Sequence, residues 1–553
     1  MKRIIYFLIF FLLFLGLFHP VNSLTQDLGR HLKTGEIILN TFSVPKTNLF
    51  SYTYPNFPFI NHHWFSEVVY KILFEKIGLN GLLIFNTILA LLAFGLIFFK
   101  ANKKAGVIAL LFASLLYIPI LFERTDVRPE FFSFLFLSLF IFILYSFRKN
   151  FTKWIFVLPV LELLWVNMHI YFPIGIVMIF FFFLDYLIQG KFKINKQTLI
   201  LVSILIITAL ATLINPNGLK GALYPFSVFQ NYGYSIEENQ NIFFLWGFAH
   251  KQSILFFFIG APLLFISLIL NFKRVLPVEW LISIFFTILA IASIRNFPLF
   301  ILVTFIPFVK ALSNIKLSLP KNAKTAFLIF LLGLAVFEAQ QIYAKKSFGL
   351  GSAMQNEKGA KEGVDFFIAN NLKGPIFNNF DIGSYLDYRL YPKEKVFVDG
   401  RPEAYPATFF TQDYIPMQLD ESKFAEVSKK YNFNTIFFSH TDQTPWGENF
   451  IKQISKNTEW KLTYLDDFVA IWTKDKNIKP DIKTDYHDIK SLIQLAHFFQ
   501  NTNFEDQEIK IYQKILNINP IYCPALYNLS IKLQKKNDPS FPIFVDKFQK
   551  NCR

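Results

Sequence analysis

Residues 79–104 read LNGLLIFNTILALLAFGLIFFKANKK, an apolar run that ends in a cluster of lysines. A helix needs about 20 mostly apolar residues to cross the hydrocarbon core of a bilayer. Other stretches of the chain have the same character, so the sequence predicts about eleven membrane-spanning helices. The predicted spans are 4–19, 79–99, 105–122, 131–147, 154–170, 174–189, 198–214, 252–270, 278–294, 298–312 and 325–343.

The composition agrees with a membrane protein. Of 553 residues, 53% are hydrophobic and 17% are charged, whereas a soluble domain carries about 25% charged residues. The chain has 55 Lys and Arg against 39 Asp and Glu. Most of this basic excess belongs to residues 1–343, with 27 basic and 13 acidic residues. It lies between apolar runs, which argues against a nucleic-acid partner.

The connections between the predicted spans alternate in charge. By the positive-inside rule, Lys and Arg collect on the cytoplasmic side. The sequence therefore predicts a cytoplasmic amino terminus and an external carboxyl-terminal part. The basic connections contain Lys2, Arg3, Lys100, Lys103, Lys104, Arg148, Lys149, Lys153, Lys191, Lys193, Lys196, Lys273, Arg274, Lys316, Lys321 and Lys324. An alternative for the first run is a signal peptide cleaved near Val21-Asn22-Ser23.

Two predicted outer loops are long, 20–78 and 215–251. In the first, an amphipathic helix is expected from Asp27, and its first turns place Asp27 and His31 on one face. A carboxylate and an imidazole at that spacing can hold a metal or share a proton. The alternative is a solvated helix start, in which Asp27 interacts favourably with the helix dipole.

More polar side chains cluster at the predicted outer ends of the spans. A His pair followed by a carboxylate can bind a ligand, although such groups also cap helices. Ionisable groups near membrane depth usually face a bundle interior or a cavity; the alternative is that long side chains reach for the interface. The residues concerned are His62, His63, Glu67, Arg128, Glu130, Asn167, His169 and Arg295.

The rest of the chain is predicted to be a soluble tail. Residues 360–475 have the pattern of a small α/β unit, with strands expected at PIFNNF, KVFVDG, TIFFSH and a hairpin around Asp466-Asp467. Asp381, Asp399 and Arg401 lie at expected strand ends, where they bind an acceptor or hold loops together. Residues 487–551 are expected to be helical and resemble a tetratricopeptide repeat. The two cysteines exclude a disulfide framework, and Cys523 is expected to pack on an apolar face.

An ordered set of motifs resembles bacterial polytopic glycosyltransferases of the GT-C superfamily, in a branch with an extracytoplasmic α/β domain and a tetratricopeptide-like tail. The motifs are DLGRHLKTGE, TNLFSYT, INHHWFSEV, RPEFFSFLF, ELLWVNMHIYFPIG, LINPNGLKGALYPF, RNFPLFILV, FNNFDIGSYLDYRLYP and KVFVDGRPEAY. The resemblance implies a GT-C-like transmembrane domain over 1–343, an α/β domain over 344–478 and a helical tail over 479–553, in the bacterial cytoplasmic (inner) membrane.

The resemblance also implies an activity, transfer of a sugar from a polyprenyl-phosphate donor to a lipid, glycan or protein acceptor. It assigns the base or metal-partner role to Asp27. This chain has Asn61-His62-His63 where relatives often have Asn-His-Glu, which leaves Glu67 as the nearest substitute. His31 is the third catalytic candidate, and a divalent metal is the one cofactor considered.

The leaving phosphate calls for cationic or hydrogen-bonding partners, for which Arg128, His169 and Arg295 are the candidates. Two other functions remain open from the sequence. One is a membrane scaffold whose helical tail binds a protein partner, and the other is a transporter for a lipid-linked glycan.

Overall fold

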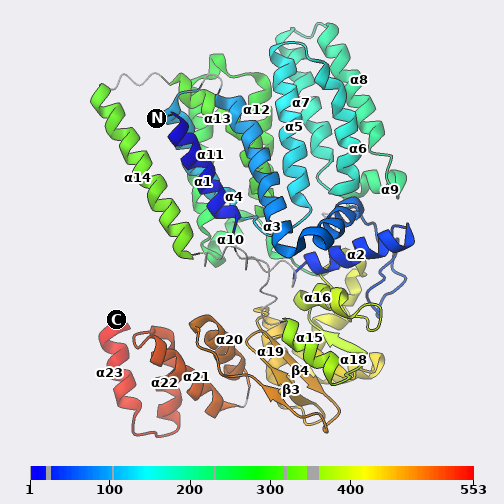
Figure 1. Cartoon of the computed structure of the whole chain (residues 1–553), viewed down its shortest axis with the longest axis vertical. Helices are drawn as coiled ribbons and strands as arrows, with labels where there is room; N and C mark the ends of the chain where they lie inside the picture. The colour runs from blue at the N-terminus through cyan, green and yellow to red at the C-terminus, as the bar shows by residue number, and fades with distance from the viewer. Residues whose placement is uncertain are drawn as a thin grey trace.

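The computed structural model describes residues 2–19, 26–102, 105–227, 232–315, 320–345, 360–502 and 504–552. Figure 1 shows a bundle of long helices on one side and a small α/β unit with a helical tail on the other. The helix α2 (Leu28–Thr41) lies between them. Lys103, Lys104, Lys316 and the alternative cleavage site at 21–23 lie outside the described residues.

Each predicted apolar run falls in a helix of the bundle. By length and composition, five described segments can cross a membrane: Trp64–Asn102, Glu130–Lys149, Gln252–Leu270, Ile294–Asn314 and Asn322–Ile342. The count of eleven spans stays a prediction. The bundle helices are α1 (Lys2–Leu17), α3 (Trp64–Asn102), α4 (Val107–Leu121), α5 (Glu130–Lys149), α6 (Leu158–Met168), α7 (Pro173–Gln189), α8 (Lys196–Ala211), α11 (Gln252–Leu270), α12 (Pro277–Ala292), α13 (Phe297–Asn314) and α14 (Lys321–Lys345).

The first apolar run is part of the bundle. Helix α1 contacts α3, α4 and α14, and its Ile5, Ile9 and Leu12 side chains are buried.

Short elements collect at the end of the bundle next to α2, which we call the α2 end. Helix α3 begins there as a surface segment and changes direction at Gly78, whose φ of +67° suits a residue without a side chain. The 215–251 loop adds α9 (Gly218–Leu223), a 3₁₀ turn η4 (Glu237–Asn239) and α10 (Ile242–Ala249).

The α/β unit is built on a mixed five-stranded sheet in the order β1-β2-β4-β3-β5. Strand β1 pairs parallel with β2, and β4 pairs antiparallel with both β2 and β3, which confirms the hairpin around Asp466-Asp467. The elements are α15 (Ala360–Ala369), β1 (Ile376–Asn378), α16 (Phe380–Leu390), α17 (Pro416–Leu419), α18 (Glu421–Tyr431), β2 (Thr435–Ser439), α19 (Pro445–Ile454), β3 (Lys461–Leu465), β4 (Val469–Thr473) and β5 (Asp481–Ile482).

The segment KVFVDG is not a strand of this sheet, contrary to the sequence prediction. Val396 forms only an isolated parallel bridge with Ser51 of the first long loop. Its N–H donates to Phe50 O at 3.1 Å, and Tyr52 N–H donates to its carbonyl at 3.2 Å. Phe397 and Val398 are fully buried, and a buried apolar run looks like a strand whatever it pairs with. This segment therefore fastens the α/β unit to the first loop.

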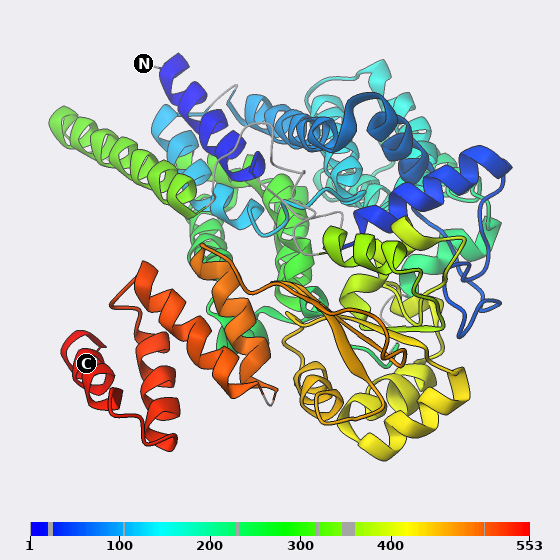
Figure 2. The same ribbon diagram turned by 60° about the horizontal axis from the view of Figure 1, so that its bottom comes forward.

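The tail consists of α20 (Ile489–Gln500), α21 (Glu505–Ile518), α22 (Cys523–Lys535) and α23 (Phe541–Cys552). Each helix contacts the next, and Figure 2 shows α21–α23 extending away from the sheet. Helix α20 attaches the tail, because the Phe498 ring packs 5.0 Å from that of His440 and 6.2 Å from that of Trp472.

The expectation that Cys523 only packs is wrong. Cys523 and Cys552 form a disulfide, with a Cα–Cα distance of 5.7 Å. Two cysteines exclude a framework of several bridges but allow one bridge, here between the first residue of α22 and the last residue of α23. Disulfides persist in oxidising compartments.

Candidate active site

The predicted site residues come from separate segments and meet at the α2 end of the bundle. These segments are the start of α2, the residues before α3 with its first turn, the α4–α5 connection with the first residue of α5, the α6–α7 turn and the α12–α13 turn. The residues that gather there are Asp27, His31, His62, His63, Glu67, Arg128, Glu130, His169 and Arg295.

Asp27 immediately precedes α2 and faces two guanidinium groups. Its Oδ2 lies 3.5 Å from Arg128 Nη2, and its Oδ1 lies 3.8 Å from Arg30 Nη2. Burial alone would raise the pKa of Asp27, but Arg128 and Arg30 outweigh it and hold the pKa below its ordinary value. About a quarter of the side chain is exposed, 25%. Asp27 is therefore an ionised carboxylate that other molecules can reach.

Glu67 is enclosed instead. Its Oε1 accepts a hydrogen bond from His31 Nδ1 at 2.8 Å, and its Oε2 accepts one from Asn61 Nδ2 at 2.6 Å. Its side chain is only 1% exposed. Burial and the charge of Arg30 lower the pKa of His31, although Glu67 opposes them. Glu67 thus fixes a neutral His31 and has no open side for an acceptor.

Four imidazole rings, including that of His31, cluster around His63. The ring of His63 lies 5.2 Å from His31, 3.9 Å from His62 and 5.2 Å from His169. Burial lowers the pKa of His62 to about 4 and that of His63 well below its ordinary value. These two imidazoles therefore carry no charge near neutral pH.

The tautomer of His169 follows from its neighbours. Trp165 Nε1–H donates to Ser133 Oγ at 2.7 Å, and Ser133 Oγ lies 2.8 Å from His169 Nδ1. The N–H of Tyr171 also points at Nδ1, at 3.4 Å. Because Nδ1 accepts from Tyr171, the hydroxyl of Ser133 donates to it as well. The proton of His169 is therefore on Nε2, which makes that atom a hydrogen-bond donor.

Three arginines surround one carboxylate at the same end. Glu238, from the 3₁₀ turn η4, has its Oε1 2.5 Å from Arg124 Nη1 and 2.9 Å from Arg128 Nη1. Its Oε2 lies 3.1 Å from Arg295 Nη2. Burial would raise the pKa of Glu238, but the three arginines lower it far more, so the carboxylate stays charged.

Two of these residues, Arg124 and Glu238, were not among the predicted site residues. Arg124 also donates from Nε and Nη2 to Glu130, both at 2.9 Å. Glu130 is thus engaged with Arg124 rather than open to a substrate. The sequence does contain a hint of Arg124, because it is a second arginine in the connection that contains Arg128. Its spacing alone, however, does not distinguish a site residue from an ordinary surface charge.

Asn167 serves to join segments. Its Oδ1 accepts from Trp64 Nε1 at 2.8 Å, and its Nδ2 donates to Ile214 O at 2.9 Å. These bonds hold the start of α3 against the residues that follow α8.

The residues suggested for a metal do not form a ready site. Asp27 faces Arg30 and Arg128, while Nδ1 of His31 is bonded to Glu67. Among the residues that the structure describes, no group of three or more His, Cys, Asp or Glu side chains is arranged to hold a metal ion.

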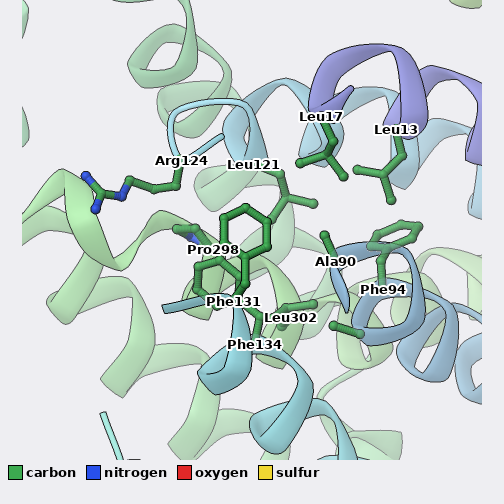
Figure 3. A pocket seen from close by; sticks show the side chains of 11 residues that line it. Leu13, Leu17, Ala90, Phe94, Leu121, Arg124, Phe131, Phe134, Pro298 and Leu302 are labelled. Atoms are coloured by element: carbon green, nitrogen blue, oxygen red, sulfur yellow. The ribbon is translucent and has the colours of Figure 1, made fainter. Parts of the chain in front are cut away.

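A small apolar cavity adjoins the arginine cluster. Its volume is about 20 Å³, room for about one water molecule. Figure 3 shows that the Arg124 guanidinium points away from the apolar side chains. The other lining residues come from α1, α3, α4, α5 and α13, and include Leu13, Leu17, Ala90, Ala93, Phe94, Leu121, Phe131, Phe134, Pro298 and Leu302.

The α/β unit covers the site from the other side. A methyl group added at Gly400 would lie 3.1 Å from Asp27 Oδ1, so the backbone there passes directly over the carboxylate. Arg401 is paired with Asp399 at 2.5 Å and donates to Asn48 Oδ1 of the first loop at 2.8 Å. Asp399 and Arg401 therefore hold loops together, the second of the two roles predicted for them, and keep the α/β unit over the site.

Comparisons with known proteins give matches in structure. The sequence matches no protein-family model and no curated protein. The archaeal oligosaccharyltransferase AglB from Archaeoglobus fulgidus, in complex with an inhibitory peptide and a dolichol-phosphate, matches with a TM-score of 0.57 and 12% identity, over 94% of this chain and 86% of that one.

Two further solved structures resemble the chain. The Archaeoglobus fulgidus oligosaccharyltransferase in complex with Zn and sulfate gives a TM-score of 0.53 at 12% identity, over 93% of this chain and 86% of that one. ArnT from Cupriavidus metallidurans in the apo state gives 0.49 at 14% identity, over 87% and 98%. The two oligosaccharyltransferase structures show that the chain shares their overall fold.

Proposed function

We infer that this chain is a membrane glycosyltransferase that moves a sugar from a polyprenyl-phosphate donor to a lipid, glycan or protein acceptor. The observation that carries the proposal is the contact of Asp27 with Arg128 at the α2 end, beside the cluster of Arg124 and Arg295. The partly exposed carboxylate of Asp27 thus lies next to a guanidinium group that can bind an anion, at the junction between the apolar helices and the α/β unit. The dolichol-phosphate in the similar oligosaccharyltransferase supports a lipid-phosphate ligand.

The chemistry uses these side chains in two roles. The acceptor hydroxyl or amine attacks the anomeric carbon of the sugar, and the bond from that carbon to the phosphate oxygen breaks. The oxygen keeps the electron pair, and arginine guanidinium groups stabilise the resulting phosphate. Asp27 takes the proton from the acceptor as general base. The Nε2–H group of His169 can also donate a hydrogen bond to the phosphate of the sugar donor.

The same proposal includes the place of the reaction. By the charge alternation between the apolar helices, we expect three parts on the outer side of the bacterial cytoplasmic membrane: the α2 end, the α/β domain over 344–478 and the tail over 479–553. The disulfide in the tail supports this orientation, because oxidising compartments preserve such bridges. The surface of the tail is the candidate for a protein partner.

The test is a transfer assay with the purified full chain in proteoliposomes. Polyprenyl phosphates bearing different radiolabelled sugars are offered together with membrane extracts as acceptor source. We expect label to move from at least one donor to an acceptor, and Asp27→Asn to abolish most of this transfer. If the parent protein binds prenyl phosphate but never transfers a sugar, the proposal of an enzyme fails and the scaffold or transporter alternatives gain.

A further inference from the structure

Glu238 joins three arginines that come from two different turns of the bundle. Arg124 and Arg128 belong to the α4–α5 connection, and Arg295 belongs to the α12–α13 turn. The carboxylate meets all three at distances of 2.5, 2.9 and 3.1 Å. Arg124 also pairs with Glu130 and Arg128 also pairs with Asp27, so Glu238 is the carboxylate that all three arginines share.

The arginines nevertheless offer more hydrogen-bond donors than Glu238 can accept. The Nε–H groups of Arg128 and Arg295 are buried and have no hydrogen-bond partner among the described residues. A carboxylate has two oxygens, whereas a phosphate monoester presents three strongly accepting oxygens and up to two negative charges. A buried donor without a partner costs free energy. A phosphate therefore suits this cluster better than the carboxylate does.

The segment that carries Glu238 is attached at both of its sides. Towards the bundle, Ser293 Oγ donates to Glu238 O at 2.7 Å. Towards the α/β unit, the Tyr234 ring stacks on Phe380 at 4.3 Å and lies 5.2 Å from Phe410. If Glu238 leaves the arginines, the segment stays anchored through Tyr234. Turning the Glu238 side chain away from the arginines therefore does not require this segment to detach from the α/β unit.

We propose that Arg124, Arg128 and Arg295 form a phosphate-binding site in which Glu238 is an internal substitute for the phosphate, displaced when phosphate binds. The inference rests on the proposed function only for the identity of the phosphate, which is the polyprenyl phosphate released when the sugar leaves, a monoester like farnesyl phosphate. Binding itself needs no sugar transfer. A free phosphate and a prenyl phosphate share the recognised group, so the experiment offers both.

The experiment measures binding of farnesyl phosphate and of inorganic phosphate to the full chain in detergent, by calorimetry. Glu238→Gln removes the competing charge with little change in size, and we expect the dissociation constant to fall about tenfold. The matched control is Glu237→Gln. That neighbouring carboxylate pairs with Lys251 at 2.9 Å and is 58% exposed, so its loss leaves the dissociation constant unchanged. Arg124→Lys, which removes the planar guanidinium, weakens binding.

A second measurement uses the unmodified protein, so it does not depend on how the variants fold. Hydrogen exchange of peptides within residues 232–241 becomes faster when farnesyl phosphate is added, because the carboxylate has left the arginines. Unchanged or slower exchange, or weaker binding by a folded Glu238→Gln variant, overturns the proposal. Tighter binding of farnesyl phosphate alone assigns the site to lipid phosphate, and tighter binding of both ligands assigns it to phosphate in general. Tighter binding without sugar transfer supports this inference while the proposed enzyme function fails.

Discussion

The Oδ2 atom of Asp27 lies 3.5 Å from Nη2 of Arg128, so the residue proposed as the base and a residue proposed to bind phosphate are ion-paired with each other. The same guanidinium contacts Glu238. If a donor phosphate draws Arg128 towards itself, Asp27 loses one of the charges that lower its pKa. Loss of that charge raises the pKa of Asp27 towards the working pH. Asp27 is then a more efficient base when the donor is bound. Donor binding would in this way activate the carboxylate.

Replacing Asp27 by Asn removes the charge with almost no change in volume. We expect the rate of sugar transfer to fall by about 10²–10⁴-fold, the usual effect of losing a general base. The control is Glu36→Gln on helix α2, which follows Asp27; the Glu36 carboxylate binds Lys33 and Lys71 at 3.0 and 2.9 Å. Transfer by Asp27→Asn within about threefold of the parent, at equal expression, would exclude Asp27 as the base.

Replacing Arg128 by Lys keeps the charge but loses the planar fork. We expect the KM for the polyprenyl-phosphate donor to rise about tenfold, since a hydrogen bond to a charged group contributes about 1.5–3 kcal/mol. Arg148→Lys is the control, because Arg148 lies at the other end of α5 and pairs with Asp185. An unchanged donor KM in Arg128→Lys would exclude Arg128 as a residue that binds the donor phosphate.

Replacing Glu67 by Gln should act on stability. The substitution removes the charge that faces His31 and Arg30 in a buried place, and breaking a buried ion pair from one side costs about 3–5 kcal/mol. Thermal unfolding in detergent measures the effect. Glu75→Gln on the same helix is the control, since Glu75 is 58% exposed and surface changes usually stay within about 0.5 kcal/mol. Equal melting temperatures for the two variants would contradict the enclosed position of Glu67.

The disulfide between Cys523 and Cys552 provides a test of orientation. If the tail lies outside the cytoplasm, protein from cells quenched with an alkylating reagent should give a linked Cys523–Cys552 peptide. Closing a loop with a sequence separation of 29 residues stabilises the tail by about 3–4 kcal/mol in the chain-entropy model, so reduction should lower its melting temperature. Alkylated thiols in freshly quenched cells, or a reporter after residue 475 that is active only in the cytoplasm, would reverse the orientation.

His440 should make the α/β unit sensitive to acid. Its Nε2–H donates to Asp466 O at 2.9 Å, and burial lowers its pKa to about 4. The unfolded chain, with a pKa near 6.5, binds the proton first. The stability that His440 contributes is therefore complete above about pH 6.5 and is lost towards pH 4, at about 1.4 kcal/mol per pH unit.

The measurement for His440 is the difference in melting temperature between the parent protein and His440→Gln. The glutamine does not titrate, so comparing the two chains cancels the other groups that change with pH. We expect the advantage of the parent at pH 7.5 to shrink at pH 5. A difference that stays constant over this range would show that His440 takes up its proton without cost in the folded state.

The order of the helices could be predicted from the sequence, because a bilayer demands long apolar helices whose backbone groups bond internally. The helices of the α/β unit and most of its strands followed from the alternation of apolar and polar residues. KVFVDG did not, because the pairing of Val396 with Ser51 depends on a loop more than 300 residues earlier. A buried apolar run carries no information about which partner it meets.

The candidate site divides in the same way. Residue chemistry and position at the ends of the apolar runs made Asp27, Arg128, His169 and Arg295 candidates, since charge near a membrane is costly wherever the chain places it. Only the packing of the helices decided that Arg124 and Glu238 complete the arginine cluster and that Glu67 is enclosed. The physical reason is distance along the chain. Arg124 Nη1 and Glu238 meet because the α4–α5 connection and the 3₁₀ turn η4 lie side by side, and no spacing in the sequence records how these segments pack.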